Sequence, residues 1–582
     1  MGSSGGSRGM VSISLFVELL RTRPRLLFWS MAALQLVLWT LVPFVFYSAP
    51  PGQLPLVLAI GHDFQLGTDF GPPLAFWLAE LAYRAMGMFG VYLLSQISIV
   101  VTFWAVLALG RAVVGEVHAA MAVLLMAGVA VFSVPTPEFG PAILAAPLWA
   151  LLLYHYWRAA GGGDFRYWLA VGIDAGLLLL TTYAGLILLG LVVLFLLSSR
   201  VGRSHLDTVG PWVAGVVTVM ILFPYLIWLD LGGGTTLIGW ADVIQNLRTW
   251  GWLVLALIVS HAGLVILIIL GRGYLIPSRS KPPEVQREPV DSGARVFVYF
   301  FALAPILAMG LFALISHRPE NFMTAPLAVM SGLAVVVAAG DRIRIEHQYV
   351  IGYAWAALLM LPAVLVALAV TIQPWIFAID LRVGRPAQEI GAFFAESFQR
   401  RTGKPLEIVA GDLPTAALVS LAAPSRPSLY LESAPEYLPK VTRREIEEKG
   451  AIVVWPTADA GGKPPAEVLR QFPNLVAEVP QTFTRRFQGR MPLMRLGWSM
   501  IRPRTPGSAP DVQAQPEPLP MQPIPLPPPE PEPPQVQAAP PVQPPPQVQH
   551  PAPREAPVRE RERERERPQR PAAPLPDRFA PQ

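Results

Sequence analysis

Long apolar runs separated by short polar loops cover the chain up to about residue 375. The first run, residues 26–47, follows a basic segment that contains Arg21, Arg23 and Arg25. At roughly 20 residues it is long enough to cross a bilayer. No small-residue cleavage site follows it, so we expect a retained anchor rather than a signal peptide, with residues 1–25 in the cytoplasm.

Further apolar runs of membrane length follow. The pattern predicts a polytopic α-helical membrane protein with about 11 transmembrane helices in residues 26–375. An odd number of spans places the two ends of this region on opposite sides of the membrane. The further runs cover residues 89–110, 116–134, 140–157, 166–181, 183–199, 208–229, 250–270, 295–316, 323–340 and 349–372.

Lysine and arginine indicate which loops face the cytoplasm, because positive charge concentrates on that side. Alternate loops from Arg111 to Arg344 are basic, whereas the loops between them contain little beyond Arg84, Arg248 and Arg318. This bias places several polar stretches on the outer face, where we expect them to converge on one cavity. They are residues 61–73, 134–140, 230–248 and 317–321.

The pattern changes after about residue 373. Strand-like runs such as LEIVAGD and AIVVWP alternate with helix-like runs such as VTRREIEEKG, which predicts a small α/β domain over residues 376–502. Because it follows the last span, we expect it on the outer, periplasmic side. Residues 503–582 are dominated by Pro, Gln, Ala and Glu, with Phe579 as the one aromatic residue, so we expect a disordered Pro-rich tail.

Composition narrows the class of protein. An apolar fraction of 53% and a charged fraction of 15% are not those of a soluble globular protein. The formal net charge is +5, but the basic residues flank the membrane runs or lie in the tail, so they indicate topology and give no reason to expect nucleic acid. The chain has no cysteine, which excludes disulfides, thiolate zinc sites and cysteine nucleophiles.

The stretch GHDFQLGTDFGPPLAFWL, residues 61–78, is where chemistry is first expected. Asp63 and Asp69 lie beside His62 at the membrane surface, where a carboxylate is costly unless it faces water, a cation or a substrate. They could serve as a general base, a cation ligand or a partner of a sugar hydroxyl. They could equally be solvated loop or helix-cap residues. Glu138, in the next outer loop, is a third candidate carboxylate.

Basic side chains of the outer loops form a second candidate set. Arg84, Arg248, His317 and Arg318 could bind a phosphate, for which a guanidinium is geometrically suited. The alternative is that they extend along the membrane interface to reach water. No P-loop, GxGxxG or HExxH motif accompanies them, and the sequence assigns no metal site.

Polar residues inside the apolar runs have simpler explanations. A carboxylate in hydrocarbon must be paired or protonated, so we expect Asp174 to bond to another helix. His155 and His261 lie on apolar helices, and we expect both to be packing residues rather than metal ligands. Pro72 and Pro73 precede an apolar aromatic stretch, and proline is well tolerated where a helix starts.

Several segments of the sequence together resemble the polytopic GT-C glycosyltransferases of family 39, in particular the bacterial RgtA/B/C/D-like branch. The resemblance spans roughly residues 26–500 and is carried by GHDFQLGTDFGPPLAFWL, PEFGPAILAAPLWALLLYHYWRAA, YWLAVGIDAGLLLLTTYAG and the final GWSMIRP. It implies transfer of a sugar from a polyprenyl-phosphate carrier, on the outer face of the bacterial inner membrane, to a lipid, polysaccharide or protein acceptor. It also implies an outer-loop carboxylate as base, cationic side chains at the phosphate and, often, a divalent cation.

The chain departs from the family pattern at several polar positions. The acidic motif expected at the start of the first outer loop is replaced by residues 53–56, Gln-Leu-Pro-Leu. Gly71 stands where a basic residue is usual, Gly140 where an asparagine is expected, and Thr182 where a lysine is expected.

These departures leave two main hypotheses. In the first, the chemistry has moved to Asp63, Asp69 and Glu138, and the chain is a glycosyltransferase. In the second, it is a catalytically inactive relative that binds lipid phosphate or organises an envelope complex, with the Pro-rich tail contacting a partner. A transporter is disfavoured, because the polar residues gather in outer loops rather than on broken midplane helices.

Overall fold

The computed structural model describes most of the chain ahead of its tail. The described residues are 18–67, 70–162, 164–230, 243–272, 284–315, 323–344, 348–432, 441–459 and 461–504. They belong to one compact unit, Met1–Ser508. The predicted tail falls almost entirely outside the described residues, so its disorder stays a prediction.

Membrane-length helices confirm the predicted class of protein. Six described helices are long and apolar enough to cross a bilayer. Their outward faces carry large apolar side chains, such as Trp212 and Met220 on α10, which are 65% and 69% exposed. Such faces are stable in lipid rather than in water. The six are α2 (Pro24–Phe46), α4 (Leu74–Val114), α10 (Val209–Asp230), α11 with α12 (Val243–Gly271), α13 (Ser292–Ala313) and α16 (Tyr349–Thr371).

The remaining predicted spans coincide with helices that are either too short or not apolar enough to be counted among these six. The count of about 11 spans therefore stays a prediction, whereas the helical multi-pass character is confirmed. These helices are α5 (Glu116–Met126), α6 (Pro141–Gly162), α7 (Phe165–Leu179), α8 (Gly185–Ser198), α14 (Thr324–Leu327) and α15 (Ser331–Ala338).

Helix α4 begins directly after Pro73, as the proline pair predicts, and it is not continuous. Met86 and Gly87 have non-helical backbone angles, with φ +61 at Gly87, so the helix changes direction there. Glycine is suited to this position because it adopts positive φ without a Cβ clash. The break separates the outer stretch that starts at Leu74 from the long apolar part that was predicted to span.

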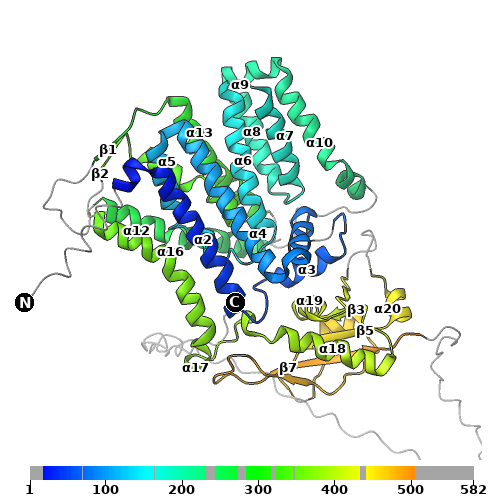
Figure 1. Cartoon of the computed structure of the whole chain (residues 1–582). Helices are drawn as coiled ribbons and strands as arrows, with labels where there is room; N and C mark the ends of the chain where they lie inside the picture. The colour runs from blue at the N-terminus through cyan, green and yellow to red at the C-terminus, as the bar shows by residue number, and fades with distance from the viewer. Residues whose placement is uncertain are drawn as a thin grey trace, which may run out of the picture. The chain divides into compact units, whose positions relative to one another are not determined.

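Helices α6, α7, α8 and α10 lie next to one another (Figure 1). Two glycines four residues apart on α7, Gly172 and Gly176, allow α10 to come close. A Cβ on Gly172 would meet the Ala214 carbonyl oxygen at 2.6 Å, and one on Gly176 would meet the Ile221 Cβ at 2.8 Å. Small residues at this spacing are the usual means by which membrane helices approach closely.

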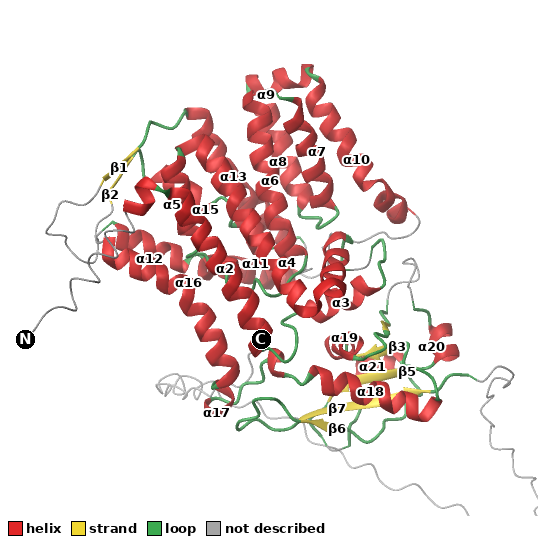
Figure 2. Cartoon of the chain, viewed as in Figure 1, coloured by secondary structure: helices red, strands yellow, loops and turns green. Residues whose placement is uncertain are grey.

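The C-terminal α/β region, residues 387–501, is built on a five-stranded sheet in the order β4-β3-β5-β7-β6 (Figure 2). Strand β3 is parallel to β4 and β5, and β7 is antiparallel to β5 and β6. β5 reads AIVVWP and is buried over Ala451–Trp455, as a central strand should be. The strands are β3 (Ile408–Gly411), β4 (Ser428–Leu429), β5 (Ala451–Pro456), β6 (Gln481–Phe483) and β7 (Met494–Ile501).

The helices of this region have identifiable end signals. Asp412 caps α19 by accepting from the Thr415 amide at 3.2 Å. Thr442 and Glu445 form a capping box at the start of α20. Gly403, with φ +71, ends α18. The helices are α18 (Ala387–Thr402), α19 (Leu413–Ala422), α20 (Arg443–Lys449) and α21 (Ala466–Gln471).

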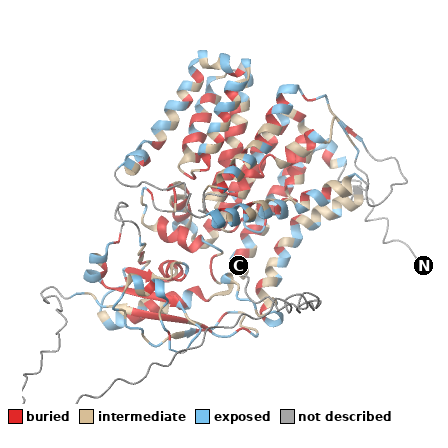
Figure 3. Cartoon of the chain, turned by 180° about the vertical axis from the view of Figure 1, so that it is seen from behind, coloured by how far each residue is buried: buried red, intermediate tan, exposed pale blue. Residues whose placement is uncertain are grey.

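Short elements connect these parts. The small helix α3 (Leu54–His62) lies between α4 and α19 and contacts both. A two-stranded antiparallel pair, β1 (Glu284–Gln286) with β2 (Arg342–Arg344), joins two distant loops. The other described α-helices are the short α9 (Arg200–Ser204) and α17 (Gln373–Ile376). Burial is greatest between the helices and on the sheet (Figure 3), which leaves the outer faces of α10 and α16 to lipid.

Replacing Gly172 by alanine should weaken the contact between α7 and α10. The added methyl group would overlap the Ala214 carbonyl, and overpacking of this kind costs ~1–3 kcal/mol. We expect a lower Tm in detergent than for the wild type. Gly190→Ala is the matched control, since nothing lies within 4 Å of a Cβ at that position of α8. Equal Tm values for the two variants would contradict the prediction.

Candidate functional site

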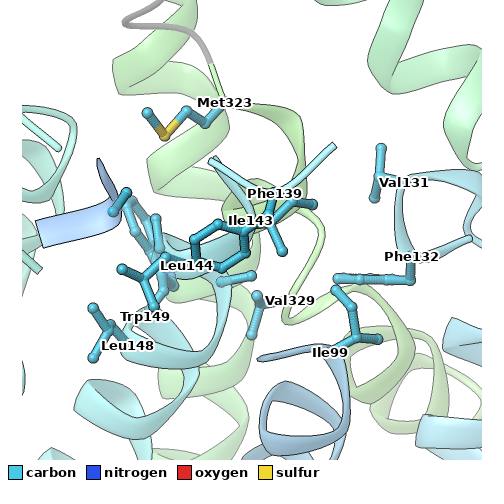
Figure 4. Packing of buried hydrophobic residues seen from close by; sticks show 14 of the residues in the cluster. Ile99, Val131, Phe132, Phe139, Ile143, Leu144, Leu148, Trp149, Met323 and Val329 are labelled. Atoms are coloured by element: carbon cyan, nitrogen blue, oxygen red, sulfur yellow. The ribbon is translucent and has the colours of Figure 1, made fainter. Parts of the chain in front are cut away.

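A cavity of about 280 Å³ lies where several predicted outer loops meet. Its wall combines the start of α3, the turn before α4, the loop 131–143, residues 181–183 and the start of α14. Phe139, Ile143 and Met323 belong to this wall and also to the main cluster of buried apolar side chains, part of which Figure 4 shows. Parts of two of the stretches predicted to converge, residues 70–72 and 135–140, contribute to this wall, whereas residues 231–242 and 317–321 lie outside the described residues. The remaining described lining residues are Gln53, Leu56, Val57, Phe76, Thr181, Thr182, Tyr183, Thr324 and Ala325.

Glu138 is the one carboxylate among the described residues that line this cavity. Its Oε1 accepts a hydrogen bond from the backbone N–H of Gln53 at 2.7 Å. Gly52 makes room for the carboxylate: its φ is +51, and a Cβ there would lie about 2 Å from the Glu138 carboxylate atoms. The turn before α3 is therefore shaped around this side chain.

The electrostatic surroundings keep Glu138 more basic than an ordinary glutamate. Burial raises its pKa, and the Gln53 N–H together with the positive charge of Arg382 lower it only in part. Arg382 belongs to the segment that follows α17, whose Val383 carbonyl accepts from the Ser48 and Ala49 amides at 2.8 and 3.0 Å. This segment and the first outer loop thus meet close to the cavity.

Buried polar side chains of α4 hold the loop that carries Glu138. Gln96 donates to the Thr136 hydroxyl at 2.9 Å, Ser95 donates to the Thr136 carbonyl, and Thr136 donates to the Ser133 carbonyl at 2.6 Å. Ser95 and Gln96 are fully buried. Sequence reasoning missed them, although two adjacent polar residues inside an apolar span are a signal that such a span has a polar partner.

The positions at which the chain departs from the family pattern gather at this cavity. Gln53, Gly71, Gly140 and Thr182 all line it. The backbone of Gln53, at the place of the missing acidic motif, instead binds the carboxylate of Glu138. The carboxylate thus reaches the wall from the loop that follows in the sequence, residues 134–140. Among the described lining residues, none is Arg, Lys or His.

The other predicted carboxylates are not part of this wall as described. Asp63 ends α3, and its Oδ1 accepts from the Ser428 hydroxyl of β4 at 3.1 Å. It is not among the residues that line the cavity. Asp69 lies outside the described residues. The catalytic roles predicted for both stay predictions.

Of the four predicted phosphate-binding cations, the two that the structure describes, Arg84 and Arg248, are not among the residues that line the cavity. Arg84 donates to Glu80 at 2.9 Å and to the His62 carbonyl at 3.3 Å, and its guanidinium lies over the Phe64 ring. Arg248 is an exposed residue of α11. His317 and Arg318 lie outside the described residues.

Glu80, which sequence reasoning passed over, is the most buried acidic side chain near the first outer loop, with 1% exposure. Its Oε1 accepts from Arg84 and lies 3.2 Å from His62 Nδ1, and its Oε2 accepts from Arg426 at 2.9 Å. A glutamate four residues before an arginine in an apolar helix is the sequence signal that could have indicated an ion pair.

Other buried polar groups pack as predicted. Asp174 on α7 pairs with His155 on α6, with 2.6 Å between the Oδ2 and Nδ1 atoms. His261 Nε2 lies 2.8 Å from the Ser331 hydroxyl. Among the described residues, no group of three or more His, Cys, Asp or Glu side chains could hold a metal ion.

A known protein family matches a segment of the chain that overlaps the cavity. Residues 71–228, which include much of the cavity wall, match the family model described as dolichyl-phosphate-mannose-protein mannosyltransferase. No curated protein sequence matches the chain significantly.

Two solved structures are similar over most of the chain. The crystal structure of ArnT from Cupriavidus metallidurans bound to undecaprenyl phosphate is 13% identical, covers 82% of this chain and 99% of its own, and has a TM-score of 0.50. The apo structure of the same protein is 15% identical, covers 82% and 98%, and has a TM-score of 0.51. The chain is thus a multi-pass membrane protein with the GT-C glycosyltransferase fold of ArnT, and the segment that carries Glu138 matches the protein mannosyltransferase family.

Proposed function

We propose that the chain is a membrane glycosyltransferase that moves a sugar from a polyprenyl-phosphate carrier to an envelope lipid, polysaccharide or protein. The observation that carries the proposal is Glu138, a half-buried and hydrogen-bonded carboxylate in the wall of a cavity formed by predicted outer loops. The ArnT fold supports the reaction class, and the undecaprenyl phosphate bound to that protein supports the class of carrier.

Glu138 acts as the general base in this proposal. It takes the proton of an acceptor hydroxyl, whose oxygen then forms a bond to the anomeric carbon of the sugar. The bond from that carbon to the carrier phosphate breaks, and its electron pair leaves on the phosphate oxygen. Attack and departure occur on opposite faces, so the configuration inverts. A raised pKa suits this role, because a base is most effective when its pKa approaches the working pH.

The departing phosphate needs positive charge or hydrogen-bond donors. We propose His317 and Arg318 for this role, because they shortly precede Met323, which lines the cavity. Arg248, and Arg84 on its exposed side, are further candidates. No step is assigned to a divalent cation.

The orientation follows from the distribution of basic residues. We propose that the protein lies in the bacterial inner membrane with its N-terminus in the cytoplasm, and that the cavity and the C-terminal α/β region face the periplasm. The Pro-rich tail would then meet an envelope partner, and nucleic acid plays no part.

One observation favours a second function. The cavity wall has Gly71, Gly140 and Thr182 at positions where the family resemblance leads us to expect polar or charged side chains. A chain that binds the lipid phosphate without transferring the sugar would tolerate this loss. The two functions are separated by a test of transfer.

Glu138→Gln should lower transfer by roughly 10²–10⁴-fold, because it removes the base but keeps the side-chain volume. Transfer is measured by mass spectrometry of envelope glycolipids after complementation of a deletion strain, and with purified protein and a panel of polyprenyl-phosphate hexoses. Glu389→Gln, on an exposed part of α18, is the control and should leave transfer unchanged. Asp63→Asn and Asp69→Asn test the other two carboxylates. Full activity of the Glu138→Gln variant would show that Glu138 is not the base. If deletion of the protein leaves the envelope glycolipids unchanged, the second function, binding of the lipid phosphate without sugar transfer, is favoured.

Transfer should depend on pH through Glu138. The base must be deprotonated, so kcat should fall as the pH drops through its raised pKa. Arg382→Gln removes a charge that lowers this pKa, so the midpoint should move to higher pH. Arg400→Gln, which removes a charge on α18, is the control. A midpoint that stays in place in the Arg382 variant would mean that Glu138 does not set the profile.

Gly52→Ala should impair transfer by displacing the Glu138 carboxylate, whose atoms a Cβ would approach to about 2 Å. We expect a loss of the order of 10²-fold. Gly403→Ala is the control: Gly403 also has positive φ, +71, in the left-handed region, but nothing lies within 4 Å of its Cβ position. Both variants place alanine at a positive φ, so equal activities would show that the clash at Glu138 is unimportant.

A further inference from the structure

Helix α3 contacts the candidate base, Glu138, at its start and a cluster of charged side chains around Glu80 at its other end. At its start, the Gln53 amide binds Glu138 at 2.7 Å. Residues 54–61 are all buried, so the helix has little freedom to adjust independently of its neighbours. At its other end, His62 and the Leu58 carbonyl contact charged side chains of α4 and of the C-terminal α/β region.

Glu80 is the centre of that distant contact. Almost no water reaches this carboxylate, and an isolated buried charge is strongly unfavourable. His62 from α3, Arg84 from α4 and Arg426 from the α/β region compensate it. The three partners come from three different parts of the fold, so the cluster fixes the positions of those parts relative to one another.

Arg426 is the member that the α/β region contributes. One guanidinium nitrogen, Nη2, donates to Glu80 at 2.9 Å and to the Leu58 carbonyl of α3 at 3.4 Å. The guanidinium also lies over the Tyr83 ring, 4.5 Å from its centroid. A single side chain therefore holds α3 and α4 together.

The backbone at Arg426 is unusual. Its φ is +48, a left-handed conformation that a residue with a Cβ rarely adopts. Such strain persists where the surrounding contacts determine the conformation, and it is enriched at functional positions. The neighbouring serines secure the turn, since Ser425 donates to the Leu406 carbonyl at 2.7 Å and Ser428 to Asp63 at 3.1 Å.

We propose that Arg426 is a positioning residue for sugar transfer: by binding Glu80 and α3, it holds the Gln53 amide against Glu138. The C-terminal α/β region thereby takes part in organising the site without lining the described cavity wall. This inference rests on the proposed function in that Glu138 is the base. A purely structural ion cluster would affect stability but would leave the properties of Glu138 unchanged.

Two variants test the proposal. Arg426→Gly removes the guanidinium and suits the positive φ, so loss of the contact is not confounded with backbone strain. Arg426→Lys keeps the charge but loses the planar guanidinium that lies over the Tyr83 ring and whose Nη2 reaches both Glu80 and the Leu58 carbonyl. The control is Arg444→Ala, which removes a guanidinium from α20 without placing a glycine inside the helix. Arg444 forms an exposed pair with Glu448 in the same region.

The first readout does not require activity. Amide hydrogen exchange of the full-length protein in detergent is measured on peptides covering residues 53–62. We expect at least ~10-fold faster exchange in Arg426→Gly, intermediate exchange in Arg426→Lys, and wild-type exchange in Arg444→Ala. Unchanged exchange in both Arg426 variants would overturn the proposal.

The second readout is the pH profile of transfer. The Gln53 N–H lowers the pKa of Glu138, so its withdrawal should move the kcat midpoint to higher pH. A lower Tm with an unchanged midpoint would mean that the cluster is only structural. Absence of transfer by the wild type would reject the proposed function, and the exchange measurement would still decide whether Arg426 holds α3.

Discussion

The compensation of the buried Glu80 charge is the interaction on which the arrangement of the site depends. A carboxylate with 1% exposure requires compensating partners: Arg84 of α4 and Arg426 of the loop before β4 supply positive charge, and His62 of α3 lies within hydrogen-bond distance. Because each partner would leave a costly buried charge if it moved away, the three segments are held in one arrangement. α3 is thereby presented with its first amide toward Glu138. Charged and polar contacts around Glu80 thus fix one end of α3, and the Gln53 amide at its other end binds Glu138.

The cavity has a simple composition: a floor of apolar side chains, a few hydroxyl and amide groups, and one carboxylate in the described wall. Gln53, Gly71, Gly140 and Thr182, at which the chain differs from the family pattern, are all part of this wall. Glu138 reaches it from a loop whose own support is polar, through the hydrogen bonds of Thr136 with Ser95 and Gln96. Its carboxylate is placed by backbone groups of Gly52 and Gln53 rather than by a charged partner, which is consistent with its raised pKa.

Close approach of backbones is the second recurring feature. Gly172 and Gly176 bring α7 against α10, and Gly61 brings α3 against α4, where a Cβ would meet the Phe76 carbonyl oxygen at 2.3 Å. In lipid, helices gain little from apolar burial against one another, so close van der Waals contact and buried hydrogen bonds provide specificity. The same two means, small residues and paired polar groups, hold both the lipid-facing helices and the walls of the cavity.

The sequence by itself determined the class of the protein, the positions of most helices, the presence of the terminal α/β region and the loops that form the cavity. These follow from local properties, since the length and period of an apolar run are sufficient to recognise a membrane helix or a strand. The tertiary structure decided which carboxylate lines the cavity. Gln53 and Glu138 are 85 residues apart, and Glu80 and Arg426 are 346 residues apart, so no local pattern relates them. The sequence favoured Asp63 as the first candidate and offered Glu138 only as a third. Only packing placed one beside Ser428 and the other in the cavity wall, because a side chain's role depends on which distant segments fold against it.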